Sequence, residues 1–82
     1  MPTVRIFGRK RKARAVFGSW AVTAYGVEYL HGYYPIARQT IIRFTNEDII
    51  EDVLDHGRDH TGEYAVTGLA DALNYARQHR AK

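Results

Sequence analysis

Alternating apolar and polar residues predict an antiparallel hairpin in the first half of the chain. In residues 14–26 the apolar positions recur with a period of two, interrupted near Gly18, which is typical of a strand with one buried face. Residues 27–36 are rich in β-branched and aromatic side chains, which favour a second strand. Gly26 lies between the two and accepts the positive φ of a tight turn. The alternating positions of the first strand are Val16, Trp20, Val22 and Ala24.

Two later segments have the spacing of amphipathic helices. The first follows Thr45, which with Asp48 matches a capping box, and Gly57 is a natural stop for it. The second follows Thr67, a typical N-cap, and has a basic C-terminus that suits the helix dipole. The apolar positions with helical spacing are Ile49, Ile50, Val53 and Leu54 in the first helix and Leu69, Ala72, Leu73 and Ala76 in the second.

The remaining segments complete a predicted α+β fold. Residues 3–7 alternate as a short edge strand, residues 8–14 are predicted to be a basic loop or arm, and residues 62–67 a compact strand. Residues 37–44 fit either a short helix or another strand. The predicted order is ββαβα, a small antiparallel sheet of three to four strands with two helices packed on one face. The chain has 82 residues, and we expect residues 1–82 to form a single domain.

The predicted hairpin contains the only tryptophan and four of the six tyrosines. Alternation turns Trp20 and Val22 towards the helices, so that Ala21, Thr23 and Tyr25 face the other way. A chain this short buries only about 60% of the surface that its unfolded form exposes, so we expect no third layer over that second face. An uncovered aromatic cluster is a candidate binding surface. Its predicted anchors are Tyr25, Tyr29 and Tyr33.

Acidic residues gather on the first predicted helix, although the net charge of the chain is +3. They lie opposite its apolar positions, where like charges four residues apart repel one another. This stretch is either a solvated face or a docking surface for a basic partner. The acidic set comprises Glu47, Asp48, Glu51, Asp52 and Asp55.

Basic residues gather before the hairpin, in the segment 8–14. Lysine and arginine at this density either neutralise the phosphates of a nucleic acid or form a solubilising, disordered arm. The candidate nucleic-acid contacts are Arg9, Lys10, Arg11, Lys12 and Arg14.

No motif in the sequence indicates catalysis, a metal centre or a membrane segment. The absence of cysteine excludes disulfides and thiolate zinc sites and favours a reducing, cytoplasmic setting. His56 and His60 are four residues apart, but Gly57 interrupts the helix that would align them, and zinc usually needs three or four protein ligands. Nothing near Ser19 marks it as an activated nucleophile, so we predict a non-enzymatic protein without metal or cofactor.

No apolar run reaches the roughly 18 residues of a transmembrane helix, and the glycines and polar residues in the first apolar stretch argue against a targeting signal.

The hairpin and the C-terminal segment each resemble segments of other small proteins. W-A-V-T-A-Y-G-V-E at residues 20–28, followed by Y-P-I at 34–36, is similar to a W-x-V-T-x-x-G-x-E hairpin in small uncharacterised proteins of phages and other mobile elements. The tail E-Y-A-V-T-G-L-A-D-A-L-N-Y-A at residues 63–76 is similar to their closing strand and helix, while the intervening segment departs from the pattern. In size and lack of cysteine the chain is also similar in kind to anti-CRISPR proteins. That resemblance implies a non-enzymatic protein that binds a nucleoprotein complex and blocks its DNA site.

Three functions remain open from the sequence. The leading hypothesis is a phage-type inhibitor that occludes a host nucleoprotein complex, such as a CRISPR surveillance complex, with the acidic set facing a basic channel and the tyrosines as apolar anchors. The alternative is a small nucleic-acid-binding or regulatory protein, in which the basic segment contacts phosphates and tyrosines stack on bases. The third is a structural protein whose uncovered sheet face pairs with itself, so both a monomer and a homodimer remain open.

Overall fold

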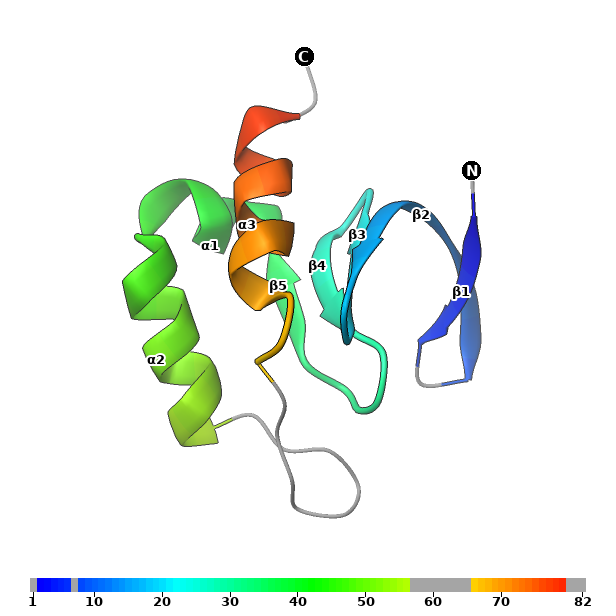
Figure 1. The fold of residues 1–82 in the computed structure, drawn as a ribbon, viewed down its shortest axis with the longest axis horizontal. Helices are drawn as coiled ribbons and strands as arrows, with labels where there is room; N and C mark the ends of the chain where they lie inside the picture. The colour runs from blue at the N-terminus through cyan, green and yellow to red at the C-terminus, as the bar shows by residue number, and fades with distance from the viewer. Residues whose placement is uncertain (1, 7, 57–65, 80–82) are drawn as a thin grey trace.

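The described part of the chain forms a five-stranded antiparallel sheet followed by three helices (Figure 1). The structure is a computed structural model that describes residues 2–6, 8–56 and 66–79. The strands lie in the sheet in their sequence order, each antiparallel to the next. The elements are β1 (Thr3–Ile6), β2 (Arg9–Phe17), β3 (Trp20–Thr23), β4 (Gly26–Tyr29), β5 (Pro35–Ala37), α1 (Arg38–Arg43), α2 (Asn46–His56) and α3 (Leu69–Gln78).

The predicted α+β class is confirmed, but the predicted order ββαβα is wrong. The five strands of the described residues all precede the helices, where three to four strands were expected. The segment that the sequence left ambiguous ends β5 and then forms the helix α1. The strand predicted at residues 62–67 lies outside the described residues, apart from Val66 and Thr67, which have no strand structure.

The segment predicted as a basic loop, residues 8–14, is mostly part of strand β2. Residues 9–12 pair with β1, and the rest of β2 pairs with β3. A register shift between Ala13 and Ala15 marks a bulge, and Figure 1 shows β2 curving from β1 over to β3. The basic side chains concealed this strand because they occupy both of its faces, and long charged side chains can reach solvent from either one.

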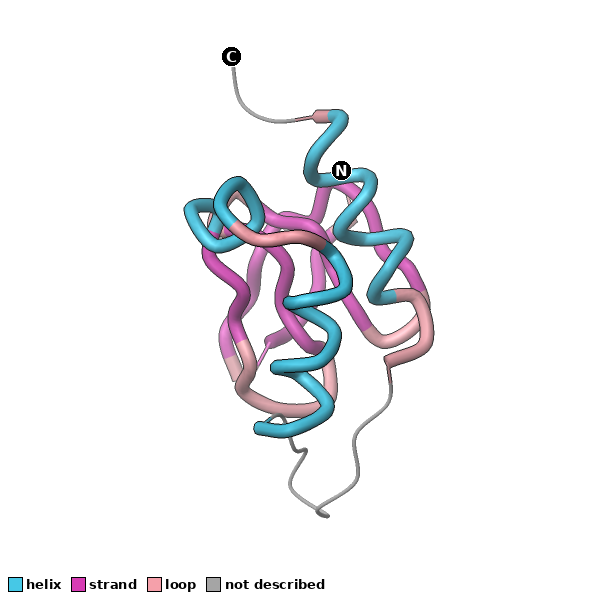
Figure 2. The backbone as a smooth tube through the Cα atoms, turned by 90° about the vertical axis from the view of Figure 1, so that its left-hand side faces the viewer, coloured by secondary structure: helices cyan, strands magenta, loops and turns pink. Residues whose placement is uncertain are grey.

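One face of the sheet packs against the helices and forms the larger hydrophobic cluster. Trp20 is fully buried in it, with its ring centroid 5.0 Å from that of Tyr29. Figure 2 shows the helices in front of the strands. The predicted orientation of Trp20 and Val22 towards the helices is confirmed. The other buried members are Val27, Ile36, Ile41, Ile49, Val53, Leu69, Ala72 and Leu73.

The opposite face of the sheet is partly covered, contrary to the expectation that no third layer exists. The β1–β2 hairpin brings Ile6 and Ala13 against Ala21 in a second, smaller cluster. Val4 and Leu30 are half-buried against it. The bulge in β2 makes this possible, because it lets the hairpin turn over the sheet. The expectation was wrong because it took residues 8–14 as a loop or arm and so did not include the β1–β2 hairpin.

Gly26 is required by the close approach of two strands after the β3–β4 turn. Thr23 pairs with Gly26 across the turn at Ala24 and Tyr25, so Gly26 is the first strand residue after the turn. Its φ is +140°, a conformation that side chains rarely adopt. A Cβ here would also overlap the carbonyl oxygen of Ile36 in β5. Both the backbone conformation and the strand packing therefore exclude a side chain.

The predicted capping box of α2 is confirmed, whereas the cap of α3 differs from the prediction. The Asp48 N–H donates to Thr45 Oγ1 at 3.1 Å, and the Thr45 N–H donates to the Asp48 carboxylate at 3.4 Å. Helix α3 begins after Gly68, which has a φ of +86°, and not after the predicted cap Thr67. Close packing accounts for the glycine, because a Cβ there would overlap the Phe17 carbonyl oxygen.

Candidate functional site

The five predicted acidic residues are exposed in two rows on α2. Residues four apart share a face of a helix, and the buried Ile49 and Val53 fix which face points into the core. Asp48 and Asp52 line a groove beside α2, and we call them the groove row. The outer row comprises Glu47, Glu51 and Asp55.

Within the described residues, one ion pair involves these carboxylates. Asp52 Oδ1 lies 3.1 Å from Nδ1 of His56, and both side chains are exposed. No arginine or lysine of the described residues forms an ion pair with either row. The carboxylates therefore remain accessible to solvent and to cations of a partner, which fits both the solvated face and the docking face that the sequence left open.

A groove of about 670 Å³ lies beside the groove row, between α2 and the segment that leads through β5 into α1. The exposed rings of Tyr33 and Phe44 line it, together with the half-buried Tyr34. Aromatic rings beside carboxylates can hold a cation through charge and through the ring quadrupole. We call this site the acidic groove. Its other lining residues are Pro35, Ile36, Thr40, Asp48, Ile49 and Asp52.

Tyr34 connects the acidic groove to the hydrophobic core. Its ring meets Trp20 edge-on with the centroids 6.4 Å apart, and its hydroxyl donates to the Asp52 carboxylate. Burial, and then the hydrogen bond to Asp52 and the negative charge of that carboxylate, raise the pKa of Tyr34 above its ordinary value. Tyr34 therefore remains a neutral donor at physiological pH and holds Asp52 beside the groove.

We expect Tyr34 to lower the stability of the protein at alkaline pH. Because its pKa is raised in the folded state, the unfolded chain releases this proton first, and the free energy of unfolding falls as the pH rises above 10.0. The Tyr34→Phe variant lacks the hydroxyl, so its free energy of unfolding should fall less steeply above that pH. At about pH 8 it should be about 1 kcal/mol less stable than the wild type, because it lacks the hydrogen bond to Asp52. Urea denaturation at several pH values measures both effects, and equal alkaline slopes would contradict the assignment.

The α1–α2 junction is tied to helix α3 by Arg77. Its Nε donates to Asn46 Oδ1 at 2.8 Å, and its Nη2 donates to the carbonyl oxygen of Phe44. The side-chain amide of Asn46 in turn donates to Asn74 Oδ1 at 2.6 Å. These bonds fix the backbone of Phe44, so α3 holds one wall of the acidic groove in place.

Sequence reasoning missed Tyr34, Phe44 and Arg77. Tyr34 and Arg77 carry no sequence signal for this site, because their partners lie far away along the chain. Phe44 did have one: it directly precedes the capping residue Thr45, the position from which a hydrophobic residue packs on the first turn of a helix. Together with the capping box, that signal places an aromatic ring beside the acidic residues.

The three predicted tyrosine anchors do not form one surface. Tyr29 is only 1% exposed and packs on Trp20, so its prediction as an exposed anchor is wrong. Strand β4 is an inner strand, and Tyr29 lies directly opposite Trp20 in β3, which turns it into the core. Tyr25 and Tyr33 are 64% and 65% exposed, but they lie beyond opposite ends of β4. Of the three, Tyr33 alone lines the acidic groove.

The predicted nucleic-acid contacts are divided between the two faces of the β1–β2 hairpin. Lys10 and Lys12 are exposed and share the outer face with Arg5, which is the direct cross-strand partner of Lys10. Arg11 occupies the other face and is half-buried. The remaining two candidates, both exposed, are Arg9 and Arg14.

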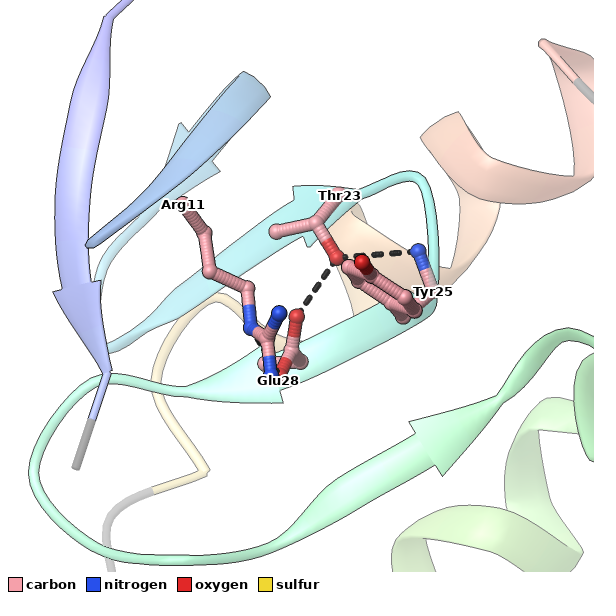
Figure 3. Close-up of polar contacts among 4 residues, drawn as sticks. All are labelled: Arg11, Thr23, Tyr25 and Glu28. Atoms are coloured by element: carbon pink, nitrogen blue, oxygen red, sulfur yellow. Dashed lines mark hydrogen bonds and ion pairs between the residues drawn. The ribbon is translucent and has the colours of Figure 1, made fainter. Parts of the chain in front are cut away.

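Arg11 takes part in an intramolecular network of polar contacts (Figure 3). Its Nε lies 3.2 Å from Glu28 Oε1, without the alignment of a hydrogen bond, and its guanidinium lies over the Tyr25 ring at 4.4 Å from the centroid. Thr23 Oγ1 donates to Glu28 Oε2 at 2.6 Å and accepts from the Tyr25 N–H at 3.1 Å. Because Glu28 is only 3% exposed, its carboxylate depends on these partners. The prediction of Arg11 as a phosphate contact therefore does not fit the structure.

Comparisons with known protein families, with curated proteins and with solved structures found no match to this chain. The resemblance to phage-encoded and anti-CRISPR proteins stays a hypothesis from the sequence.

The histidine pair of the sequence can be followed only in part. His56 contacts Asp52, and His60 lies outside the described residues. Within residues 2–6, 8–56 and 66–79, no three histidine or carboxylate side chains are placed to hold a metal ion. That part of the chain also has no helix long and apolar enough to cross a membrane.

Proposed function

We propose that this chain is a non-enzymatic binding protein that docks through helix α2 onto a basic surface of a partner. The observation that carries the proposal is the joint exposure of the groove row and the outer row. Among the described residues, His56 is the one basic side chain that contacts either row. Exposed carboxylates attract a basic surface during diffusion and fix its orientation on contact. Recognition by charge therefore explains why α2 tolerates the repulsion within its own rows.

The placement of the opposite charges supports this orientation. Figure 1 shows α2 at one end of the long axis and β1 at the other, and the molecule extends 37 Å along that axis. Arg5, Lys10 and Lys12 lie on the hairpin at the far end from the acidic rows. Such a separation gives the protein a dipolar field, which turns α2 towards a basic partner before contact.

The partner that we propose is a host nucleoprotein complex that holds nucleic acid in a channel lined with lysine and arginine. Helix α2 has 11 residues, a length of roughly 16 Å, and its two rows present a compact negative surface over that length. Carboxylates at the channel would compete with phosphates for the same cations. Occlusion of this kind is what the resemblance to anti-CRISPR proteins implies, and it requires neither a cofactor nor catalysis.

We expect neutralisation of the outer row to weaken binding to such a complex about tenfold or more. The triple variant Glu47→Gln, Glu51→Gln, Asp55→Asn removes three charges that contact nothing in the core, and it relieves repulsion within α2, so the fold should be kept. Tenfold corresponds to about 1.4 kcal/mol, a modest contribution from each of three charges at an interface. Displacement of labelled DNA from a purified CRISPR surveillance complex, followed by fluorescence anisotropy, measures the loss.

The matched control removes three charges from the other end of the molecule. The variant Arg5→Gln, Lys10→Gln, Lys12→Gln alters exposed side chains on the outer face of the hairpin. It should displace DNA as well as the wild type does. The proposal fails if the outer-row variant keeps full potency, or if the hairpin variant loses more than the outer-row variant.

The outer face of the hairpin supports the alternative, a nucleic-acid-binding protein. Arg5, Lys10 and Lys12 are exposed on paired strands, which is a suitable spacing for contacts along a phosphate backbone. A gel shift with single-stranded DNA at two salt concentrations separates the two functions. A salt-sensitive shift that disappears in the hairpin variant would favour the alternative.

A further inference from the structure

We propose that the acidic groove receives an arginine side chain from the basic surface of the partner. This inference deepens the proposed function and rests on it for the identity of the partner, but the groove itself can be tested on the isolated protein. Its lining combines the two kinds of group that bind a guanidinium, the rings of Tyr33 and Phe44 and the carboxylates of Asp48 and Asp52.

The size and exposure of the groove admit an extended side chain together with the backbone that carries it. Its volume of about 670 Å³ lies within the range of ligand pockets, roughly 300–1,000 Å³. Tyr33 is 65% and Phe44 48% exposed, so both rings are accessible from solvent. A large exposed aromatic ring in a soluble protein is a frequent anchor for a partner. The two rings thus provide the apolar contact that carboxylates alone do not.

The protein already binds one of its own arginines in the same way. Arg11 lies over the ring of Tyr25 at 4.4 Å and pairs with the Glu28 carboxylate at 3.2 Å (Figure 3). A planar guanidinium can do both at once, because its face meets the ring while the positive charge at its edge lies beside the carboxylate. The acidic groove offers this combination of ring and carboxylate at its surface. None of its described lining residues is an arginine, although Arg43 beside the groove already places its guanidinium over the Phe44 ring at 5.7 Å from the centroid.

The lining is held in place before a partner arrives. Asp52 accepts from the Tyr34 hydroxyl, and Asp48 is held by the capping box with Thr45. The backbone of Phe44 is fixed by Arg77. Groups positioned in advance lose little conformational entropy on binding, so even a single side chain can be held with measurable affinity.

The test is a titration of isotope-labelled protein with a capped pentapeptide that carries one arginine between glycines, followed by amide chemical shifts at about pH 8 and about 150 mM salt. We expect saturable shifts at Tyr33, Phe44 and Asp52, with a dissociation constant on the order of 1 mM. The matching lysine peptide should bind at least about threefold more weakly, because an ammonium group cannot stack flat on a ring.

Two substitutions on the same helix provide the matched control. Asp52→Asn and Glu51→Gln each remove one exposed carboxylate from α2, but only Asp52 lines the acidic groove. We expect Asp52→Asn to weaken peptide binding at least about fivefold and Glu51→Gln less than about twofold. The amide introduced by Asp52→Asn keeps an acceptor oxygen for Tyr34, and circular dichroism checks that the fold is kept. Equal losses in the two variants would overturn the proposal in favour of diffuse charge attraction.

Other outcomes distinguish an arginine from a second copy of the chain as the occupant of the groove. They also test the groove independently of the proposed function. Equal binding of the arginine and lysine peptides would refute the arginine site. Shifts at the groove and the hairpin that grow with protein concentration alone would show a second copy as the occupant and would likewise refute it. Peptide binding without displacement of DNA would retain the groove and refute the nucleoprotein partner, whereas displacement of DNA without peptide binding would do the reverse.

Discussion

Replacing Gly26 with alanine should lower the free energy of unfolding by at least about 3 kcal/mol. Gly26 has a φ of +140°, which an alanine adopts only with strain, and the new Cβ would overlap the carbonyl oxygen of Ile36. That oxygen belongs to the backbone of β5, so no side chain can rotate to make room. Relief would require β5 to move away from β4, and Ile36 would then leave the core. Urea denaturation followed by circular dichroism measures the loss.

Gly8 provides the control for this substitution. It also has a positive φ, of +83°, but a Cβ there would meet nothing within 4 Å. Gly8→Ala should therefore show the conformational strain without the steric overlap, at a cost of about 1 kcal/mol. If both variants lose the same stability, the close approach of β4 and β5 does not determine the need for Gly26.

The Tyr29→Ala variant should lose about 3–5 kcal/mol, the usual cost of removing a large aromatic side chain from a core. Tyr29 is 1% exposed, and its ring packs on that of Trp20. The stability of a typical domain is only about 5–15 kcal/mol, so this variant should be largely unfolded at moderate urea concentrations. Trp20 reports the change directly, because its fluorescence depends on burial beside Tyr29.

Tyr25→Ala is the matched substitution on the surface. Tyr25 is 64% exposed, and its ring lies under the Arg11 guanidinium. Its removal should cost less than about 1 kcal/mol, the range of an exposed cation–π contact. Similar losses in the two variants would mean that the tyrosines of the hairpin share one environment, as the sequence alone suggested.

The fold could be predicted where the side-chain pattern follows burial directly. Trp20 and Val22 alternate with smaller or polar residues in β3, and the capping box at Thr45 marks the start of α2. Only residues 9–13 of strand β2 were missed, because the basic side chains on both its faces conceal the period of two. The single strand predicted over residues 14–26 is wrong, since a turn at Gly18 and Ser19 divides it into the end of β2 and strand β3. The second hydrophobic cluster depends on the β1–β2 hairpin and was missed with it.

The candidate site was predictable only in its charge. Five acids opposite the apolar face of one helix predict an exposed negative surface from helical spacing alone. The acidic groove requires the fold, because Tyr33 and Phe44 come together only when β5 and α1 bring the chain back beside Asp52. Likewise, no local pattern distinguishes the buried Tyr29 from Tyr25, since the outcome depends on which strands flank β4.

The bent strand β2 joins the two hydrophobic clusters through a single backbone. Its first half pairs with β1 and carries Arg11, which forms an ion pair with the buried Glu28. Its second half pairs with β3. Detachment of the β1–β2 hairpin from the sheet would expose Ile6 and would leave the buried Glu28 carboxylate without its Arg11 partner. The hairpin and the rest of the sheet are therefore coupled. Unfolding of the basic β1–β2 hairpin alone, with the acidic helix still folded, would be energetically costly.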